Sequence, residues 1–161
     1  MVTARDSAGN ETTKVVNFTV IDNTPPSLTL KGNTIGLWPP DHRYETVSIG
    51  DLVLAASDNC DATVGVTSVY ITQVASDEVE NSQGDGNTSN DMVIAADCRS
   101  VQLRAERDGG GNGRVYTITL KVRDGLGNST TANAKVTVSK SQNGSPAVDD
   151  GPQFVVASGC P

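Results

Sequence analysis

The amino-acid sequence predicts an all-β fold arranged as a two-layer sandwich. Apolar and polar residues alternate in several short segments, as they do in strands with one buried face. Glycine, asparagine and aspartate gather between those segments, where turns need them, and no segment shows helical periodicity. Only 4% of the 161 residues are aromatic. The core is therefore expected to consist mainly of Val, Ile, Leu and Ala side chains.

The clearest alternation lies in residues 114–139. Apolar side chains occupy every second position of two strands, at Tyr116, Ile118, Leu120 and Val122 and then at Ala134, Val136 and Val138. The connecting segment D-G-L-G-N, residues 124–128, contains two glycines that can adopt a positive φ. This pattern predicts a β-hairpin, with Tyr116 placed where a tyrosine corner would lie.

The same hairpin pattern occurs at the N-terminus, in residues 2–20. Four residues recur at a constant offset of 118 positions, the distance from Asp6 to Asp124; the matches are Asp6, Gly9, Asn10 and Thr13 with Asp124, Gly127, Asn128 and Thr131. Phe18 and Val20 match Val136 and Val138 at the same offset. Similarity at a fixed period is typical of repeat arrays, and this period fits one sandwich plus a linker.

The repeat divides the chain into three predicted parts. Residues 1–23 are the C-terminal hairpin of a preceding repeat plus its linker, residues 24–139 are a complete sandwich, and residues 140–161 are a linker or tail that could begin a further unit. Two consecutive prolines, Pro25 and Pro26, predict that the entry to the sandwich is stiff and extended.

Five further strands are expected before the hairpin, in residues 27–31, 47–57, 66–74, 92–96 and 101–105. Together with the hairpin they give seven antiparallel strands, which predicts an immunoglobulin-like sandwich. Around the fifth of these strands, Arg99, Gln102, Arg104 and Glu106 are expected on the outer face.

Charge and motif content point away from several functions. The net charge of −7 disfavours binding to nucleic acid or to anionic lipid, and no apolar run is long enough to insert in a membrane. His42 is the only histidine and no serine lies in a G-x-S-x-G motif. We therefore expect no enzymatic activity.

Several motifs resemble the bacterial immunoglobulin-like and hyalin-repeat (HYR) modules. They are the D-x-x-G-N hairpin followed by D-N-T-P-P, the runs LWPPDHRY and SDNCD, and the segment CRSVQLRAERDGGGNGRVYTITLKVRD. The resemblance covers about residues 1–139. It implies a secreted or cell-surface protein in which such modules act as spacers, adhesive arms or accessory domains beside enzymes, and it carries over no catalytic residues.

In a seven-strand sandwich the loops carrying Cys60 and Cys98 share one end. We therefore expect a Cys60–Cys98 disulfide, in keeping with the extracellular setting that the resemblance implies. The alternative is two reduced thiols in a cytosolic protein. Cys160 is left to pair beyond this chain or to remain free.

The same end gathers potential calcium ligands, because the linker and two loops are expected to meet there. They are Asp22, Asn23, Asp58, Asn59, Asp61 and Asp124. Calcium takes six to eight oxygen ligands, so an interdomain calcium site is one prediction. The alternative is that these residues cap turns through their own backbone.

The sequence offers two further candidate sites. A long acidic loop offers a second calcium candidate, composed of Asp77, Glu78, Asp85, Asn87 and Asp91, but it lacks the order of an EF-hand and could be only a solvated loop. Trp38 and Tyr44 could form a carbohydrate-stacking pair, or Trp38 could close the end of the sandwich.

The expected function is that of a non-catalytic structural or adhesive repeat module in a larger secreted or cell-surface protein. Its partners would be neighbouring repeats, other surface proteins or glycans. One alternative is an accessory or carbohydrate-binding domain of a secreted hydrolase. Another is a self-assembling fibre subunit that uses residues 2–20 as donor strands.

Overall fold

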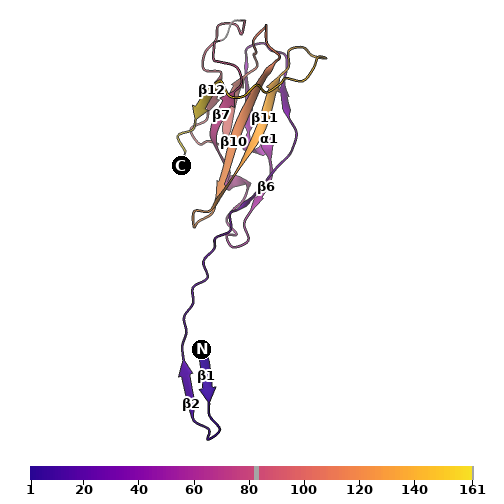
Figure 1. The fold of residues 1–161 in the computed structure, drawn as a ribbon. Coiled ribbons are helices and arrows are strands. Elements are labelled where there is room, and N and C mark those ends of the chain that lie inside the picture. Colours follow the sequence, from indigo (N-terminus) through magenta and orange to yellow (C-terminus); the bar gives the residue numbers. More distant parts are fainter. Residues whose placement is uncertain (82–83, 161) are drawn as a thin grey trace.

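The structure, a computed structural model, describes residues 1–81 and 84–160 and confirms the all-β sandwich (Figure 1). The strands are β1 (Val2–Arg5), β2 (Glu11–Lys14), β3 (Ser27–Leu30), β4 (Ile35–Leu37), β5 (Tyr44–Ser48), β6 (Val53–Ser57), β7 (Tyr70–Ser76), β8 (Met92–Ile94), β9 (Ser100–Arg104), β10 (Arg114–Arg123), β11 (Ser129–Val138) and β12 (Phe154–Ala157). A helical turn, α1 (Ile49–Leu52), and a 3₁₀ turn, Val66–Ser68, interrupt them. No helix in these ranges has the length and apolar character needed to cross a membrane.

The strands form two layers around one core. The first layer has the order β12-β7-β10-β11-β4, and the second consists of the pair β3-β6 and the sheet β5-β9-β8. Neighbours are antiparallel except β4, which pairs with β11 in parallel. Side chains from both layers meet in a single apolar cluster that includes Val47, Leu103 and Leu120.

The strand expected in residues 47–57 is divided by α1. Asp51 causes the break locally, because its Oδ2 accepts hydrogen bonds from the backbone N–H and the hydroxyl of Ser48, at 2.9 and 2.6 Å, and so caps a helical turn. Ile49 and Leu52 keep their side chains buried through the turn. The chain therefore pairs first with β9 and then with β3.

The central strand β10 carries the predicted alternation, and its tyrosine is buried as expected. Tyr116, Ile118, Leu120 and Val122 are each 0% exposed. The Tyr116 hydroxyl donates to the carbonyl of Arg104 at 2.8 Å, which ties the start of β10 to the end of β9. This strand spans the whole sandwich, so its two ends define the two ends of the molecule's main body.

The N-terminal hairpin reproduces the part of the β10–β11 hairpin that lies next to its turn. Val2 pairs with Lys14 in β1–β2, just as Leu120 pairs with Ala132 at the offset of 118 positions. The turns also match, because the N–H of Asp6 donates to the Asn10 carbonyl at 3.0 Å and that of Asp124 donates to the Asn128 carbonyl at 3.0 Å. The sequence repeat is thus a structural repeat.

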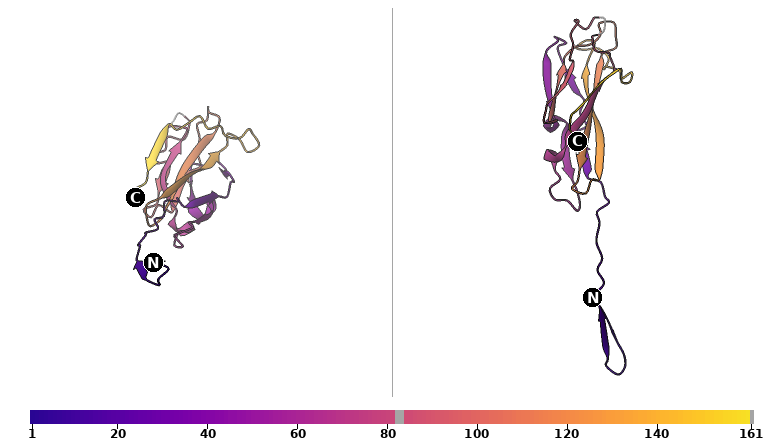
Figure 2. Two further views of the ribbon diagram at one scale, coloured as in Figure 1. Left: turned by 60° about the horizontal axis from the view of Figure 1, so that its bottom comes forward. Right: turned by 90° about the vertical axis from the view of Figure 1, so that its left-hand side faces the viewer.

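The N-terminal hairpin lies apart from the sandwich, at the end of an extended segment (Figures 1 and 2). In that segment Phe18 and Val20 are 86% and 84% exposed, whereas their counterparts Val136 and Val138 in β11 are 0% exposed. An apolar face that is buried in the second copy is therefore uncovered in the first.

The tail does not behave as a free linker. After residues 140–153 it returns as β12, which pairs with β7 at the edge of the first layer. This pairing brings Cys160 to Cys98, and the two form a disulfide with their Cα atoms 6.4 Å apart. The predicted Cys60–Cys98 pairing is therefore wrong, and Cys60 is a free, exposed thiol. The prediction failed because β12, which carries the chain on to Cys160, was not expected to pair with the edge of this sandwich.

Candidate functional site

The linker and two loops meet at the end of the sandwich where β10 finishes. One carboxylate oxygen from each of Asp22, Asp58 and Asp124 lies within 4.8 Å of the other two. Asp22 is held there because the side-chain amide of Asn128 donates to its carbonyl at 3.1 Å. We call these three residues the junction cluster.

The carboxylates of the junction cluster differ in the hydrogen bonds that they accept. Asp58 Oδ1 accepts the backbone N–H groups of Cys60 and Asp61, but Asp58 Oδ2 is buried and accepts no hydrogen bond from the residues that the structure describes. Desolvation opposes ionisation of Asp124, yet hydrogen bonds from Asn128, Gly127 and Leu126 together outweigh it and lower the pKa of Asp124. No lysine or arginine in residues 1–81 and 84–160 forms an ion pair with the cluster.

The other predicted ligands at this end are placed differently. Asp61 lines the same small pocket, of about 300 Å³, but its carboxylate binds the hydroxyl of Thr63 and the N–H of Gly125. Asn23 and Asn59 are exposed. Three of the six predicted ligands therefore converge. One of their oxygens, the buried Oδ2 of Asp58, is of the type that coordinates a hard cation such as calcium.

Cys60 lies beside the junction cluster, and the pKa of its thiol depends on the charge of that cluster. Partial desolvation raises the pKa of the Cys60 thiol, and the negative charges of Asp22 and Asp58 raise it further. A cation bound to those two carboxylates would remove the second effect and lower the pKa.

The second calcium candidate is divided by the structure, because an arginine lies among its carboxylates. The guanidinium of Arg114, itself 0% exposed, lies 2.6 Å from Asp91 and 2.9 Å from Glu78. It also lies 3.8 Å from Asp85 and 3.5 Å from Glu106. Arg114 thus supplies the positive charge that a metal ion was expected to bring.

Of the remaining members of that candidate, Asn87 is exposed in a turn with a φ of 61°, and Asp77 faces a different pocket. The expectation that Glu106 lies on the outer face is also wrong, since it is 0% exposed. The reason is that β9 ends at Arg104, after which the chain turns Glu106 towards Arg114 beneath the acidic loop.

The buried ionic network, Glu78, Asp85, Asp91, Glu106 and Arg114, contains more acid than base. Asp91 Oδ1 and Glu106 Oε1 are buried, and no donor within residues 1–81 and 84–160 forms a hydrogen bond with either oxygen. Desolvation raises the pKa of Glu106, and the neighbouring carboxylate of Asp91 adds to the rise. A proton on Glu106 would supply the donor that these oxygens lack.

Replacement of Glu106 by glutamine is expected to change how stability depends on pH. Because the folded pKa of Glu106 is raised, its neutral form stabilises the fold fully below its unfolded pKa of about 4.3, and this contribution is lost as pH rises through the folded pKa. The E106Q variant should therefore gain stability relative to the wild type as pH rises from about 4. Urea unfolding at a series of pH values measures this. The exposed E45Q variant should track the wild type, and parallel profiles for E106Q and wild type would contradict the prediction.

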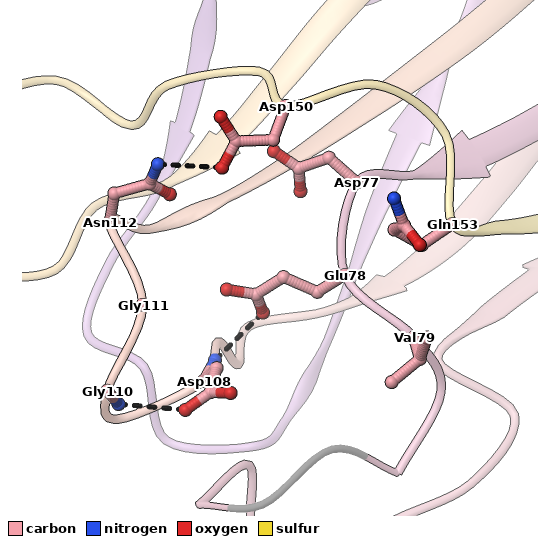
Figure 3. Close-up of a pocket in the computed structure, with 9 residues that line it drawn as sticks. All are labelled: Asp77, Glu78, Val79, Asp108, Gly110, Gly111, Asn112, Asp150 and Gln153. Carbon is pink, nitrogen blue, oxygen red and sulfur yellow. Dashed lines mark hydrogen bonds between the residues drawn. The ribbon is translucent and has the colours of Figure 1, made fainter.

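A third acidic feature lies at the opposite end of β10 from the junction cluster. A pocket of about 500 Å³ there is lined by Asp77, Glu78, Asp108 and Asp150. Figure 3 shows how these side chains lie around it. These residues come from the end of β7, from the loop before β10 and from the returning tail. The tail thus completes a pocket that the sandwich without it would lack.

Trp38 borders a separate groove of about 630 Å³ between β4 and β5, where its side chain is 43% exposed. Asp41, Glu45 and Asn33 line the same groove. Tyr44 does not line this groove. Its hydroxyl donates to the Asn90 carbonyl, and the guanidinium carbon of Arg104 lies over its ring, 4.2 Å from the ring centroid. The predicted aromatic pair thus does not form one surface.

Comparison with known proteins leaves the family open, because no family model, curated protein or solved structure matches the chain.

Proposed function

We propose that this chain is a non-catalytic structural or adhesive repeat module of a larger secreted or cell-surface protein. The observation that carries the proposal is the structural repeat: β1–β2 has the register and the turn hydrogen bonds of the β10–β11 hairpin. Residues 1–23 would then close a preceding sandwich, whose other strands would cover Phe18 and Val20. This arrangement is a tandem array in which the period sets the spacing.

The immunoglobulin-like assignment is supported by the strand order. The second layer contains the pair β3-β6 and the sheet β5-β9-β8, with α1 joining β5 to β6, and the first layer contains β4-β11-β10-β7 with β12 at its edge. An oxidising, extracellular setting is supported by the Cys98–Cys160 disulfide, because such bonds persist mainly outside the cytosol.

The module's mechanical role is to hold its neighbour at a defined angle, and the junction cluster would serve that role. We infer that calcium binds Asp22, Asp58 and Asp124, which would join the linker to both loops. The two positive charges of the ion would offset most of the negative charge of three adjacent carboxylates, and the ion would coordinate the buried Oδ2 of Asp58. A linker fixed in this way resists bending without any further interface.

Calcium is expected to raise the thermal midpoint by a few degrees, because a ligand that binds only the folded state adds about 2.7 kcal/mol at a hundred times its dissociation constant. It should also accelerate alkylation of Cys60 by lowering that thiol's pKa. The D58N variant should lose both effects while keeping the Oδ1 acceptor for Cys60 and Asp61. The D97N variant, changed at an exposed aspartate in another turn, should respond like the wild type. Equal responses from D58N and D97N would refute the site.

Two alternatives have observations of their own. The groove beside Trp38 combines an exposed indole with carboxylates and an amide, which suits stacking on a sugar in an accessory domain of a secreted hydrolase. The uncovered apolar face of residues 2–20 suits donor-strand exchange in a fibre subunit. Light scattering distinguishes the fibre subunit from the repeat module, because a repeat module is expected to be a monomer both with and without residues 1–20.

A further inference from the structure

Asp22 and Lys140 occupy equivalent positions at the offset of 118, each just beyond one copy of the hairpin. In the second copy, β11 ends at Val138, yet Lys140 still contacts its own sandwich. The Nη2 of Arg107 donates to the carbonyl of Lys140 at 3.0 Å. The loop between β9 and β10, residues 105–113, therefore extends along the chain to two residues beyond the last strand of the hairpin.

In the first copy, Asp22 is bound from the opposite direction. The side-chain amide of Asn128 donates to the carbonyl of Asp22 at 3.1 Å, and the hydroxyl of Thr130 donates to the carbonyl of Pro26. The following sandwich thus holds the chain from Asp22 onwards. Because a carbonyl oxygen has two lone pairs, the carbonyl of Asp22 can accept a second hydrogen bond from a preceding sandwich as well.

These contacts leave no free linker between two consecutive sandwiches. Val20 corresponds to Val138, the last residue of β11, so a preceding sandwich would hold the chain as far as Val20. Only Ile21 separates Val20 from Asp22, and two residue steps span at most about 7 Å. A β9–β10 loop that extends two residues past its last strand must therefore meet the end of the next sandwich.

The end of the sandwich that faces this gap presents apolar side chains to solvent. Leu126, in the β10–β11 turn, is 69% exposed, and Ile21 is 66% exposed. Leu126, Asp22 and the free thiol of Cys60 line one small pocket, so they lie together where the linker is held. We call Ile21, Cys60 and Leu126 the docking surface. Single exposed apolar residues are common, but these lie where the neighbouring loop has to be.

We propose that the docking surface packs against the β9–β10 loop of the preceding sandwich, so that consecutive sandwiches touch directly. The proposal rests on the tandem array proposed above and names the partner at its junction, which is another sandwich of the same kind. Ile21 and Leu126 are covered by the contact, and their burial favours it. The carbonyl of Asp22 accepts hydrogen bonds from both sandwiches. The contact fixes the angle between neighbours in addition to any calcium bound at the junction cluster.

The test compares side-chain oxidation by hydroxyl radicals, mapped by mass spectrometry, in the intact chain and in a tandem protein. In the tandem protein, residues 24–119 are joined to residue 2 of the intact chain, so that residues 2–20 complete the added sandwich. Residues 2–23 and 120–161 occur once in this protein, so each of their peptides reports on a single site. Both proteins are measured in the same calcium buffer, so a difference between them reports on the added sandwich and not on the ion.

Oxidation of Ile21 and Leu126 is expected to fall severalfold in the tandem protein, while oxidation of Val148, an exposed residue of the tail, stays unchanged. Leu126→Ser should restore the oxidation of Ile21, because it removes an apolar side chain from the contact. Leu54→Ser in the same sandwich is the matched control. Leu54 is 63% exposed on β6, and its replacement should leave Ile21 protected.

Phe18 distinguishes failure of this proposal from failure of the array on which it rests. The added sandwich should cover Phe18, which is 86% exposed in the intact chain. Protection of Phe18 without protection of Ile21 and Leu126 would overturn the docking surface and leave the array standing. Unchanged oxidation of Phe18 in the tandem protein would overturn both. Equal effects of Leu126→Ser and Leu54→Ser on Ile21 would also overturn the docking surface.

Discussion

Replacing Arg114 with methionine is expected to lower the free energy of unfolding by about 3–5 kcal/mol, because it leaves buried carboxylates without their counter-charge. Arg114 contacts Glu78, Asp85, Asp91 and Glu106, three of which are at most 1% exposed. Such a change is a large fraction of the stability of a typical domain. Urea unfolding followed by tryptophan fluorescence measures it, since Trp38 is the only tryptophan.

Arg123 provides the matched control for this variant, because it lies on the same strand and is exposed. R123M should change the free energy of unfolding by less than about 0.5 kcal/mol. If R114M does not fold, R114K distinguishes charge from geometry: it keeps the charge but loses the fork that reaches several carboxylates, and should be intermediate. A loss below about 1 kcal/mol for R114M would contradict the assigned role of the buried ionic network.

Replacing Cys160 with serine is expected to destabilise the protein by about 4 kcal/mol. The disulfide to Cys98 closes a segment with a sequence separation of 62, and this cross-link restricts the unfolded chain. The loss should be accompanied by faster amide exchange in β12, which lies at the edge of the first layer and pairs with β7. Guanidinium unfolding under non-reducing conditions gives the free energy.

Cys60 is the control for the disulfide, because it is the free, exposed cysteine. C60S should leave stability unchanged, and titration of the folded wild type should detect a single reactive thiol. Non-reducing peptide mapping that links Cys60 to Cys98 would contradict the structure and restore the pairing expected from loop positions.

The disulfide shows where sequence reasoning reached its limit. Loop positions in a seven-strand sandwich place Cys60 and Cys98 at one end, and this inference neglected a strand donated from the tail. The segment Phe154–Ala157 does alternate in burial, but four residues after a linker rich in Gly and Pro are too few to distinguish an edge strand from the start of a new unit. The partner of a cysteine depends on such pairing, which is a tertiary property.

The elements with strong local patterns were predictable. The alternation in residues 114–138 and the glycines of the D-x-x-G-N turn determine a hairpin and its register. The repeat at 118 positions was confirmed down to the turn hydrogen bonds. By contrast, α1 was missed because a single capping aspartate, Asp51, interrupts an otherwise apolar run.

The acidic residues illustrate a second limit. The sequence places Asp77, Glu78, Asp85 and Asp91 in one loop, but their functions separate in space. Asp85 and Asp91 face Arg114, while Asp77 faces the tail. The burial of Glu106 had no local signal, because a charged residue just after a strand usually lies in solvent. Contacts from distant parts of the chain explain it, because Arg114, the hydroxyl of Thr88 and the ring of His42 all reach the carboxylate of Glu106.

The central claim is that residues 2–20 close a sandwich of the same kind as residues 24–139. The shared register allows a direct test: residues 24–119 are joined to residue 2 of the intact chain, so that residues 2–20 take the place of residues 120–138 in the added sandwich. Amide hydrogen exchange of residues 2–20 is then measured in this tandem protein and in the original chain. We predict slow exchange in the tandem protein and fast exchange in the original chain. Equally fast exchange in both would contradict the claim.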